Sequence, residues 1–445
     1  MKAKIFTYVT AMILFGALLA SFPPTAQEQV NNLASAPRKY TLEVLPGLGG
    51  LAGAFSINDT GLVSGTSEPS GDPFDRALVW RDAQPADLGS LGGHNSSVAY
   101  PNKNDNGWLA GFSETSDSDP YQENFCQFMC SSPTGNCLPF NQTCRGFLWQ
   151  SKTSELIALP SLPGGNNSYA FTVNNLLQAV GAAENGVLDP TCIAPQVFDF
   201  EAVVWSLGPD GAPFISQRLS PIVGDTVSAA DAIDQHGNAV GASGPCGPLG
   251  PGIGAHAVLW QGGRPIDLGN LGGAMNNIAT AINHQGQIVG ISDLPGDNAT
   301  HSFLWQGGTM KDLGTLRPDD TFVLAESIND RGEVVGFSCG PVDCRGFHWQ
   351  GGVMTDLNSF LPASSPLLIT NAADINSRGE IAVQAFDQTL QDFVAAVLIP
   401  DGNEDPSLGA AAQTENIQHK VVVLPEHIRE MLESRLPRQN FLIAH

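Results

Sequence analysis

The sequence predicts an all-β fold assembled from seven copies of one short unit, and three observations predict it. A segment containing Asn-x-x-Gly between apolar residues recurs along the chain, as in AINHQGQIVG (residues 281–290) and AESINDRGEVVG (325–336). Short apolar runs that end in Trp recur with it, and six of the 7 Trp residues occupy this position. Asp-Leu-Gly segments such as DLGNLGG (267–273) form the third landmark. Such regular self-similarity indicates a repeat architecture.

The Asn-x-x-Gly segment predicts a tight hairpin. The Asn side chain caps a type I turn, and the Gly accepts a positive φ. Copies are spaced by about 47 residues, with insertions in units two and three. Leu177 stands where the other units have Gly. The aligned positions are Asn58, Asn104, Asn174, Asp234, Asn283, Asn329 and Asn376.

The runs that end in Trp are continuous rather than alternating, as expected of strands buried on both faces. They end at Trp80, Trp149, Trp205, Trp260, Trp305 and Trp349, and the seventh unit has Leu398 instead. With the Asp-Leu-Gly strand, each unit has four strands and no polar face, which is typical of a β-propeller blade. The first strand is rich in Ala and should be innermost. Unit two has YPNKN (100–104) there and should be irregular.

The two ends of the repeat region predict a closed ring. Residues 40–50 (YTLEVLPGLGG) match a fourth strand with nothing before it, while the last unit stops at 392–400 without one. Pairing the two removes sheet edges. The predicted fold class is therefore all-β, a seven-bladed β-propeller over 40–400 closed by the N-terminal strand. A linker and a short amphipathic C-terminal helix, beginning at Pro425, are expected within 401–445.

The N-terminus and the composition indicate export. Lys2 and Lys4 precede an apolar run from Ile5 to Ala20, shorter than the ~20 residues of a membrane span, so 1–26 is predicted to be a signal peptide. We expect a secreted or periplasmic protein with no membrane span in the mature chain. The formal net charge of −24 argues against nucleic acid as a partner.

Eight cysteines fit an exported chain with disulfides. All of them fall between the second and third strands of their units, so their loops should emerge at one end of the ring. We expect Cys339–Cys344 within one loop and Cys192–Cys246 between adjacent units. Two bridges are expected among Cys126, Cys130, Cys137 and Cys144, with three pairings open. The spacing of these four is also compatible with the start of a zinc site, but export favours disulfides.

The repeats resemble a known family. HAVLW (256–260), HSFLW (301–305) and GTMKDLGTL (308–316) are similar to the HAF repeats, which are named for their His-Ala-Phe triplet. The resemblance covers roughly residues 40–400. It implies an exported bacterial repeat protein with no established activity, and it brings no catalytic residues.

Other repeated polar residues have structural explanations. We expect His256 and His301, at the heads of their strands, to bond to the backbone. The repeated Asp87, Asp267, Asp312 and Asp356 should bond the local turn or the neighbouring blade, and the Trp set should pack in the core. Residues 113–124 and 292–301 offer oxygen ligands for Ca²⁺, but neither has the spacing of a calcium loop. No cofactor and no catalytic residue are predicted.

These features favour a non-enzymatic exported propeller that binds an extracellular polymer, a peptide or an envelope protein, or serves as a scaffold. Function would reside in the variable loops, so the site is expected on the disulfide-bonded face near the channel mouth. The alternative is a propeller hydrolase or lyase that acts on extracellular polymers at the channel mouth. Such a site would be assembled from several loops without a local motif.

Overall fold

The computed structural model describes residues 39–401, apart from 73, 99, 124–125, 127–141, 195, 248–249 and 252–254. The expected signal peptide and C-terminal helix lie outside the described residues. Among the residues that are described, no helix is long and apolar enough to cross a membrane.

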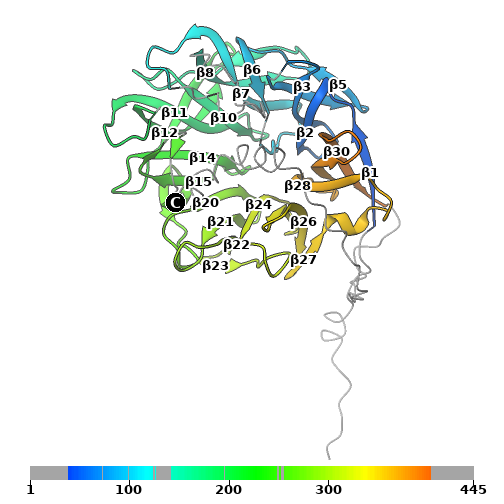
Figure 1. Ribbon diagram of the computed structural model, residues 1–445. Helices are drawn as coiled ribbons and strands as arrows, with labels where there is room; N and C mark the ends of the chain where they lie inside the picture. Colours follow the sequence, from blue (N-terminus) through cyan, green and yellow to red (C-terminus); the bar gives the residue numbers. More distant parts are fainter. Residues whose placement is uncertain are drawn as a thin grey trace, which may run out of the picture. The chain divides into compact units, whose positions relative to one another are not determined.

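The described chain folds into antiparallel sheets of four strands (Figure 1). Five sheets have four strands each, and an eight-stranded sheet joins two further such units through a single parallel bridge between Thr300 and Phe322. Each of the first six units is a simple meander, which is the arrangement of a β-propeller blade. One short extra pair, β16–β17, lies outside these units.

The strands, in chain order, are as follows: β1 Tyr40–Leu45, β2 Gly49–Ile57, β3 Val63–Pro69, β4 Arg76–Arg81, β5 Gln84–Asp87, β6 Gly92–Ser97, β7 Trp108–Ser118, β8 Gln142–Gln150, β9 Leu156–Ala158, β10 Ser168–Val173, β11 Ala179–Leu188, β12 Phe198–Leu207, β13 Pro213–Leu219, β14 Val227–Ile233, β15 Ala239–Gly244, β16 Cys246–Gly247, β17 Gly250–Pro251, β18 His256–Gln261, β19 Arg264–Asp267, β20 Asn277–Ile282, β21 Ile288–Asp293, β22 Thr300–Gln306, β23 Thr309–Asp312, β24 Phe322–Ile328, β25 Val334–Cys339, β26 Cys344–Gln350, β27 Val353–Asp356, β28 Leu367–Ile375, β29 Ile381–Asp387 and β30 Asp392–Pro400. A 3₁₀ turn, η2 (Leu357–Phe360), follows β27.

The first strand of each unit is innermost, as the sequence predicted. Neighbouring first strands contact one another, including β2 and β28 from the two ends of the chain (Figure 1). Their repeated Ala residues are fully buried, because only a small side chain fits where the strands crowd together. These residues are Ala54, Ala170, Ala230, Ala279, Ala325 and Ala372.

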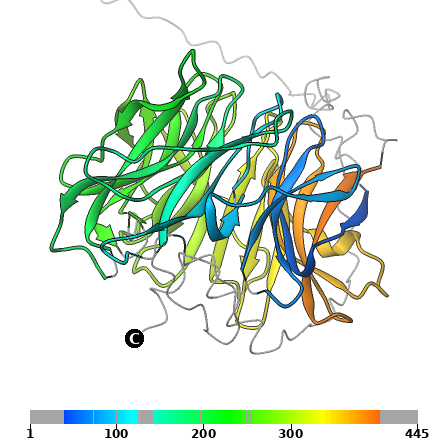
Figure 2. The same cartoon turned by 90° about the horizontal axis from the view of Figure 1, so that it is seen from above.

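The N-terminal strand completes the last sheet. β1 pairs with β30 in antiparallel register from Tyr40 opposite Pro400 to Leu45 opposite Ala395. Seen from the perpendicular direction, the strands of each unit run between the two ends of the ring (Figure 2). One end carries the hairpins between first and second strands, and the other carries the connections between second and third strands.

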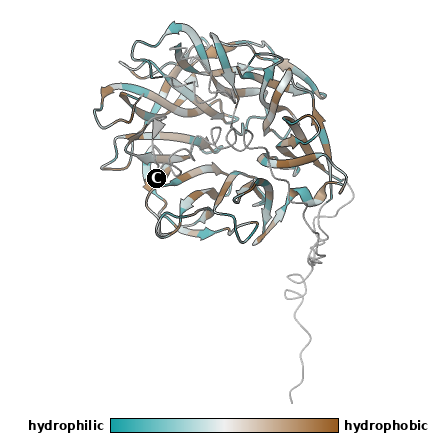
Figure 3. Ribbon diagram, in the orientation of Figure 1, coloured by the Kyte–Doolittle hydropathy of each residue, from teal (hydrophilic) through white to brown (hydrophobic). Residues whose placement is uncertain are grey.

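The core lies between adjacent sheets, where buried apolar residues of neighbouring units form shared clusters. Hydrophobic residues accordingly recur along the strands of the units (Figure 3). Trp80, Trp205 and Trp260 are buried, and each indole Nε1 donates to a backbone carbonyl of the segment that precedes its unit's first strand. The distances are 2.8 Å to Pro46 O, 2.9 Å to Pro160 O and 2.8 Å to Ser220 O. These three Trp residues therefore pack in the core, as predicted, and each indole N–H has a backbone acceptor.

Unit two is irregular in the way the sequence predicted. Its first strand, β6, ends at Ser97, well before the turn at Asn104. The amide of Asn102 takes the place of a strand backbone: its Nδ2 donates to Ala110 O at 3.2 Å, and its Oδ1 accepts from Ala110 N at 2.8 Å. The side chain thus satisfies β7 where the first strand is interrupted.

Candidate functional site

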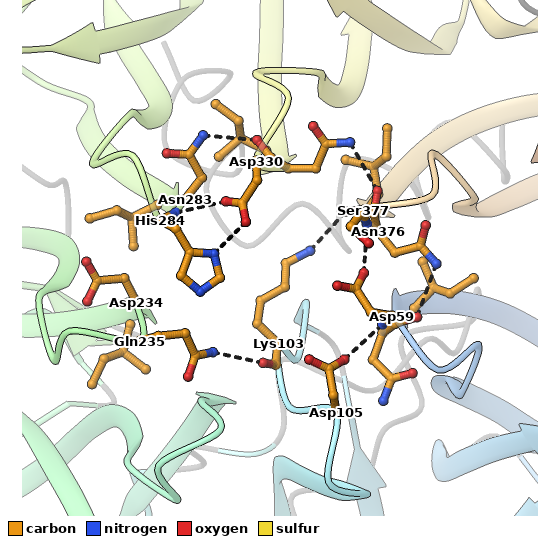
Figure 4. A pocket seen from close by; sticks show the side chains of 17 residues that line it. Asp59, Lys103, Asp105, Asp234, Gln235, Asn283, His284, Asp330, Asn376 and Ser377 are labelled. Atoms are coloured by element: carbon orange, nitrogen blue, oxygen red, sulfur yellow. Dashed lines mark hydrogen bonds and ion pairs between the residues drawn. The ribbon is translucent and has the colours of Figure 1, made fainter. Parts of the chain in front are cut away.

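The Asn-x-x-Gly hairpins gather at one end of the ring and surround a small cavity of about 70 Å³ (Figure 4). A bound water needs roughly 10–15 Å³ by this measure, so the cavity holds a few waters or one small polar group. Side chains from six of the seven units line it. We call it the axial cavity.

Each repeated Asn caps its own turn. In unit one, Asn58 Oδ1 accepts from the backbone N–H of Thr60 at 3.0 Å and of Leu62 at 2.9 Å. The Gly that follows has a positive φ, +85° at Gly61. In unit three Leu177 holds this conformation at φ 59°, which is strained for a residue with a β-carbon.

The same Asn side chains also join the units into a ring. Each Nδ2 donates to the backbone carbonyl of the equivalent residue in the next unit. The donor–acceptor pairs are Asn58 to Asn104 O at 2.8 Å, Asn104 to Asn174 O at 2.7 Å, Asn174 to Asp234 O at 2.9 Å, Asn283 to Asn329 O at 3.0 Å, Asn329 to Asn376 O at 3.0 Å and Asn376 to Asn58 O at 3.1 Å. We call this series the Asn relay. Asp234 interrupts it, because a carboxylate has no N–H to donate to Asn283 O.

A second series of bonds runs outside the relay, through the residue after each Asn. Asp105 Oδ1 accepts from Asp59 N at 3.0 Å, Asp59 Oδ1 accepts from Ser377 N at 2.7 Å, and Asp330 Oδ1 accepts from His284 N at 3.0 Å. These carboxylates therefore bond neighbouring turns. The carboxylates at the mouth of the axial cavity (Figure 4) thus accept backbone N–H groups and hold neighbouring turns of the ring together.

Lys103 extends toward the centre of this end and is already paired (Figure 4). Its Nζ forms an ion pair with the buried Asp374 and lies 3.2 Å from Ser327 Oγ and 3.1 Å from Ile375 O. Asp374 Oδ2 also accepts from Ile57 N at 2.9 Å. Lys103 of unit two thus ties itself to units six and seven.

Three disulfides lie at the opposite end. Cys192 bonds Cys246 between units three and four, and Cys339 bonds Cys344 within unit six, as the sequence led us to expect. Cys126 bonds Cys144 in unit two, one of the three arrangements left open. Cys130 and Cys137 lie outside the described residues. Three disulfides indicate an oxidising, extracellular or periplasmic compartment.

A buried carboxylate near the end of the second strand recurs at this disulfide-bonded end. Glu184 Oε2 accepts from Asn166 N at 2.7 Å and Asn167 N at 2.8 Å, and Glu114 and Asp293 do the same for Asn95 and Asn276. The sequence held a signal for this set that was not recognised as a site: in these three units an acid stands three residues after the Gly of the second strand, and an Asn follows the Gly-Gly pair by two or three residues.

Two carboxyl groups meet in the interior beside these loops. Burial, followed by the charge and contact of Glu184, raises the pKa of Glu123 to about 8. Glu123 Oε1 accepts from Gln196 Nε2 at 3.0 Å, Val197 N at 2.9 Å and Phe198 N at 3.0 Å. Its Oε2 has no hydrogen-bond partner. Both Glu side chains are fully buried.

Asp189 and Asp199 form a second pair of carboxyl groups, and Asp199 directly follows Phe198 in the chain. Burial, followed by the charge and contact of Asp189, raises the pKa of Asp199 to about 7. Asp189 and Asp199 lie within reach of the Cys192 and Cys246 sulfurs, and such a set could hold a metal ion. The two sulfurs are joined in a disulfide, so they are not thiolate ligands here.

The residues singled out in the sequence have local roles, with one correction. Asp87, Asp267, Asp312 and Asp356 each accept a backbone N–H two residues ahead, at 2.7, 2.8, 2.7 and 2.8 Å. The expectation that His256 and His301 bond to the backbone is wrong. Their Nδ1 atoms lie 2.9 Å from Asp225 Oδ2 and 2.9 Å from Asp312 Oδ2, because the strand-start position faces a carboxylate of a neighbouring segment.

Comparison with solved structures shows likeness of fold. The chain is similar to oligogalacturonate lyase from Vibrio parahaemolyticus, with 10% identity, a TM-score of 0.47, and 83% of this chain and 97% of that one covered. It is similar to an acylaminoacyl peptidase from Pyrococcus horikoshii, with 13% identity, a TM-score of 0.46, and 78% and 52% covered. The β-propeller domain of the trilobed protease from Pyrococcus furiosus gives 10% identity, a TM-score of 0.42, and 83% and 98% covered.

The chain spans about half the length of the acylaminoacyl peptidases that it matches. No family model matches the chain. No curated protein matches it either. Function is therefore argued from the residues of this chain.

Proposed function

We propose that this chain is a secreted or periplasmic, seven-bladed β-propeller, closed by its N-terminal strand, that binds an extracellular polypeptide without catalysing a reaction. The binding surface is the disulfide-bonded end around unit three. At the opposite end, the polar groups around the axial cavity bond one turn to the next, and the cavity is small. The two ends therefore differ in how many side chains remain available to contact a partner.

Exposed apolar side chains at the end of β11 and in the loop that follows it are the observation that carries the proposal. Val187, Leu188 and Ile193 are each about half exposed or more, and so is Tyr121 beside them. Tyr121 packs edge-on against Phe198, with ring centroids 4.6 Å apart, and Phe198 pairs with Leu188. We call these four exposed residues the unit three patch. Apolar side chains gathered on loops commonly mark an interaction site.

The composition of the patch favours a polypeptide over a polysaccharide. Three of its four residues are aliphatic, so it offers aliphatic surface rather than a row of aromatic rings. The chain carries a formal net charge of −24, which favours a partner with cationic groups. Cys192–Cys246 cross-links the loop that presents Ile193, and this reduces the entropy lost when the loop is ordered against a partner.

The alternative of a hydrolase or lyase finds less support. The carboxyl groups with raised pKa values are those an acid–base mechanism would use. Glu123 is fully buried, however, and Asp199 is nearly so. A polymeric substrate would not touch them without opening the loops.

The test is binding to a library of cationic, apolar peptides immobilised as an array. We expect selective binding that Leu188→Asp and Ile193→Asp together reduce strongly. Leu176→Asp is the matched control, since Leu176 is 63% exposed on the turn after Asn174 of the same unit, at the other end of the ring. Equal loss in the control, or binding only to polysaccharide arrays, would count against the proposal.

A further inference from the structure

A groove lies between units one and two, at the end of the ring that carries the Asn-x-x-Gly turns. Its volume is about 500 Å³, compared with about 70 Å³ for the axial cavity. Pockets that hold small molecules typically measure about 300–1,000 Å³. Residues 60–62 and 105–107, from two neighbouring turns, line the groove together with residues 80–82 and 151–152, at the ends of the Trp strands β4 and β8. We call it the unit one–two groove.

The turns beside this groove depart from the rest of the repeat. Units four, five and six follow the Trp strand with Gln and then Gly-Gly, at 261–263, 306–308 and 350–352. These glycines have positive φ and offer no side chain. Unit one instead has Arg81 followed by Asp82 and Ala83, which hold φ of 48° and 57°, and unit two has Ser151 and Lys152. Residues with a β-carbon are strained at such φ values, and backbone strain is concentrated at functional sites.

Arg81 and Lys152 line the groove as cations that no carboxylate neutralises. The chain has 44 acidic and 20 basic residues, and most of its Arg residues within the described ranges form ion pairs. The paired ones are Arg76, Arg218, Arg317, Arg331, Arg345 and Arg378. Arg81 instead donates one N–H to Ser151 O at 3.0 Å, and its Cζ lies 5.7 Å from the centroid of the Trp149 ring. These contacts hold the guanidinium next to Lys152 and leave its other N–H groups for a ligand.

The remaining polar groups of the groove are mainly acceptors. Asp105 is engaged within the ring, since its Oδ1 accepts from Asp59 N and its Oδ2 accepts from Asn175 Nδ2, both at 3.0 Å. Asp82 is exposed at the groove. Thr60 Oγ1 donates to Asn58 Oδ1 at 2.8 Å and so presents its lone pairs outward. Asp82 and Thr60 can therefore accept hydroxyl protons from a molecule whose negative group is held by the two cations.

We propose that the unit one–two groove binds a small hydroxylated molecule that carries one oxyanion, such as a sugar acid or a sugar phosphate. Arg81 and Lys152 hold the oxyanion, because a planar guanidinium beside an ammonium suits a carboxylate or a phosphate. Asp82 and Thr60 accept hydroxyl groups. The groove lies at the opposite end of the ring from the unit three patch, so the proposal does not depend on what that patch binds.

Calorimetric titration of the purified chain at low ionic strength tests the ligand class. The four probes are D-glucuronate, glucose 6-phosphate, glucose and inorganic phosphate. We expect at least one of the two charged sugars to bind at a single saturable site, about tenfold or more tighter than glucose and inorganic phosphate. The stronger of the two identifies the oxyanion as carboxylate or phosphate. No saturable binding of either charged sugar, or equal affinity for glucose or for inorganic phosphate, would overturn the proposal.

Arg81→Gln and Lys152→Gln should each weaken binding of the charged sugar by about tenfold or more. Both variants should fold, because units two, four, five and six already have Gln where unit one has Arg81, and Lys152 is exposed. Arg264→Gln is the matched control: Arg264 is exposed on β19 of unit four, and its loss changes the net charge equally. It should keep the affinity of the wild type. An equal loss in Arg264→Gln, or unchanged binding in the Arg81→Gln and Lys152→Gln double variant, would overturn the assignment.

Discussion

Replacing Asp234 with Asn should stabilise the ring, because Asp234 is the one interruption in the Asn relay among the aligned turns. Asp234→Asn supplies an Nδ2 that can donate to Asn283 O. At present Asp234 Oδ2 accepts from Asn238 Nδ2 at 2.8 Å. In units three and five, the residue four places after the Asn is Gln178 or Gln287, whose Oε1 accepts from that Asn. Asn238 can present its own Oδ1 after a half-turn of its amide.

The expected gain is that of one hydrogen bond, about 0.5–1.5 kcal/mol in the free energy of unfolding. For a chain of this size that corresponds to roughly 1–2 °C in the unfolding midpoint. The reverse change, Asn174→Asp, removes the bond to Asp234 O and buries a carboxylate. Gln178 can turn its amide to donate to that carboxylate, so we expect a loss of about 1–3 kcal/mol.

Asn329→Asp should lower the free energy of unfolding much more than Asn174→Asp does. Asn329 Nδ2 donates both to Asn376 O and to Glu333 Oε2, the latter at 2.6 Å. Burial raises the pKa of Glu333, but hydrogen bonds from His348 and Asn329 outweigh it and bring the pKa to about 2, so Glu333 is charged. The change would place two buried carboxylates in contact, at a cost of about 3–5 kcal/mol.

Differential scanning calorimetry of the four proteins at pH 7 is the assay, with Asp319→Asn as a control for the loss of one surface charge. The expected order of stability is Asp234→Asn, wild type, Asn174→Asp and Asn329→Asp. The reasoning is refuted if Asp234→Asn lowers the midpoint of a correctly folded protein. It is refuted equally if the two Asn→Asp changes cost the same, since the partner four residues away would then be irrelevant.

Three further predictions follow from single features. Leu177→Gly should stabilise the chain by about 0.5–1 kcal/mol in urea unfolding, because Leu177 holds φ 59° where the other units have Gly; no change or a loss would contradict the strain. The free energy of unfolding should fall by a few kcal/mol as pH rises from about 5 to about 9, because Glu123 and Asp199 have folded pKa values of about 8 and 7, far above their unfolded values, and bind more protons when folded. Urea unfolding midpoints measured across that pH range should fall less in Glu123→Gln than in the wild type. An equal fall would show that Glu123 does not cause the pH dependence. Cys192→Ser with Cys246→Ser should cost about 3–4 kcal/mol, since the bridge closes a sequence separation of 54, and it should lower binding to the unit three patch; unchanged calorimetric stability would contradict this.

Features written into one repeat were predictable from the sequence. The turn after each aligned residue and the continuous strands that end in Trp are local patterns, which seven and six copies reinforce. The missing fourth strand of the last unit stands out by comparison with the other copies. The first-strand Ala residues pointed to crowding near the axis, and all six are fully buried. The two expected disulfides could be paired because each lies in a loop whose place in the repeat was known.

Features that arise between units were not predictable in the same way. The Nδ2 bonds of the relay require the next unit's carbonyl, whose position depends on how the sheets pack. Glu123 and Glu184 are 61 residues apart in number and meet only because the connection that carries Glu123 lies beside β11. His256 and His301 were misjudged because strand register, not composition, places carboxylates beside them.

The pairing of β1 with β30 has a consequence for how the chain folds. Thr41 Oγ1 donates to Asp401 Oδ1 at 3.0 Å, although 360 positions separate the two residues. Contacts between neighbouring strands can form as soon as each unit is complete, but this pairing carries the largest loop-closure entropy and should form last. Until it does, β30 has an open edge on which another chain could add a strand. Folding of the exported chain should therefore end in a slow step that is sensitive to protein concentration, and shortening the segment before Tyr40 should not remove it.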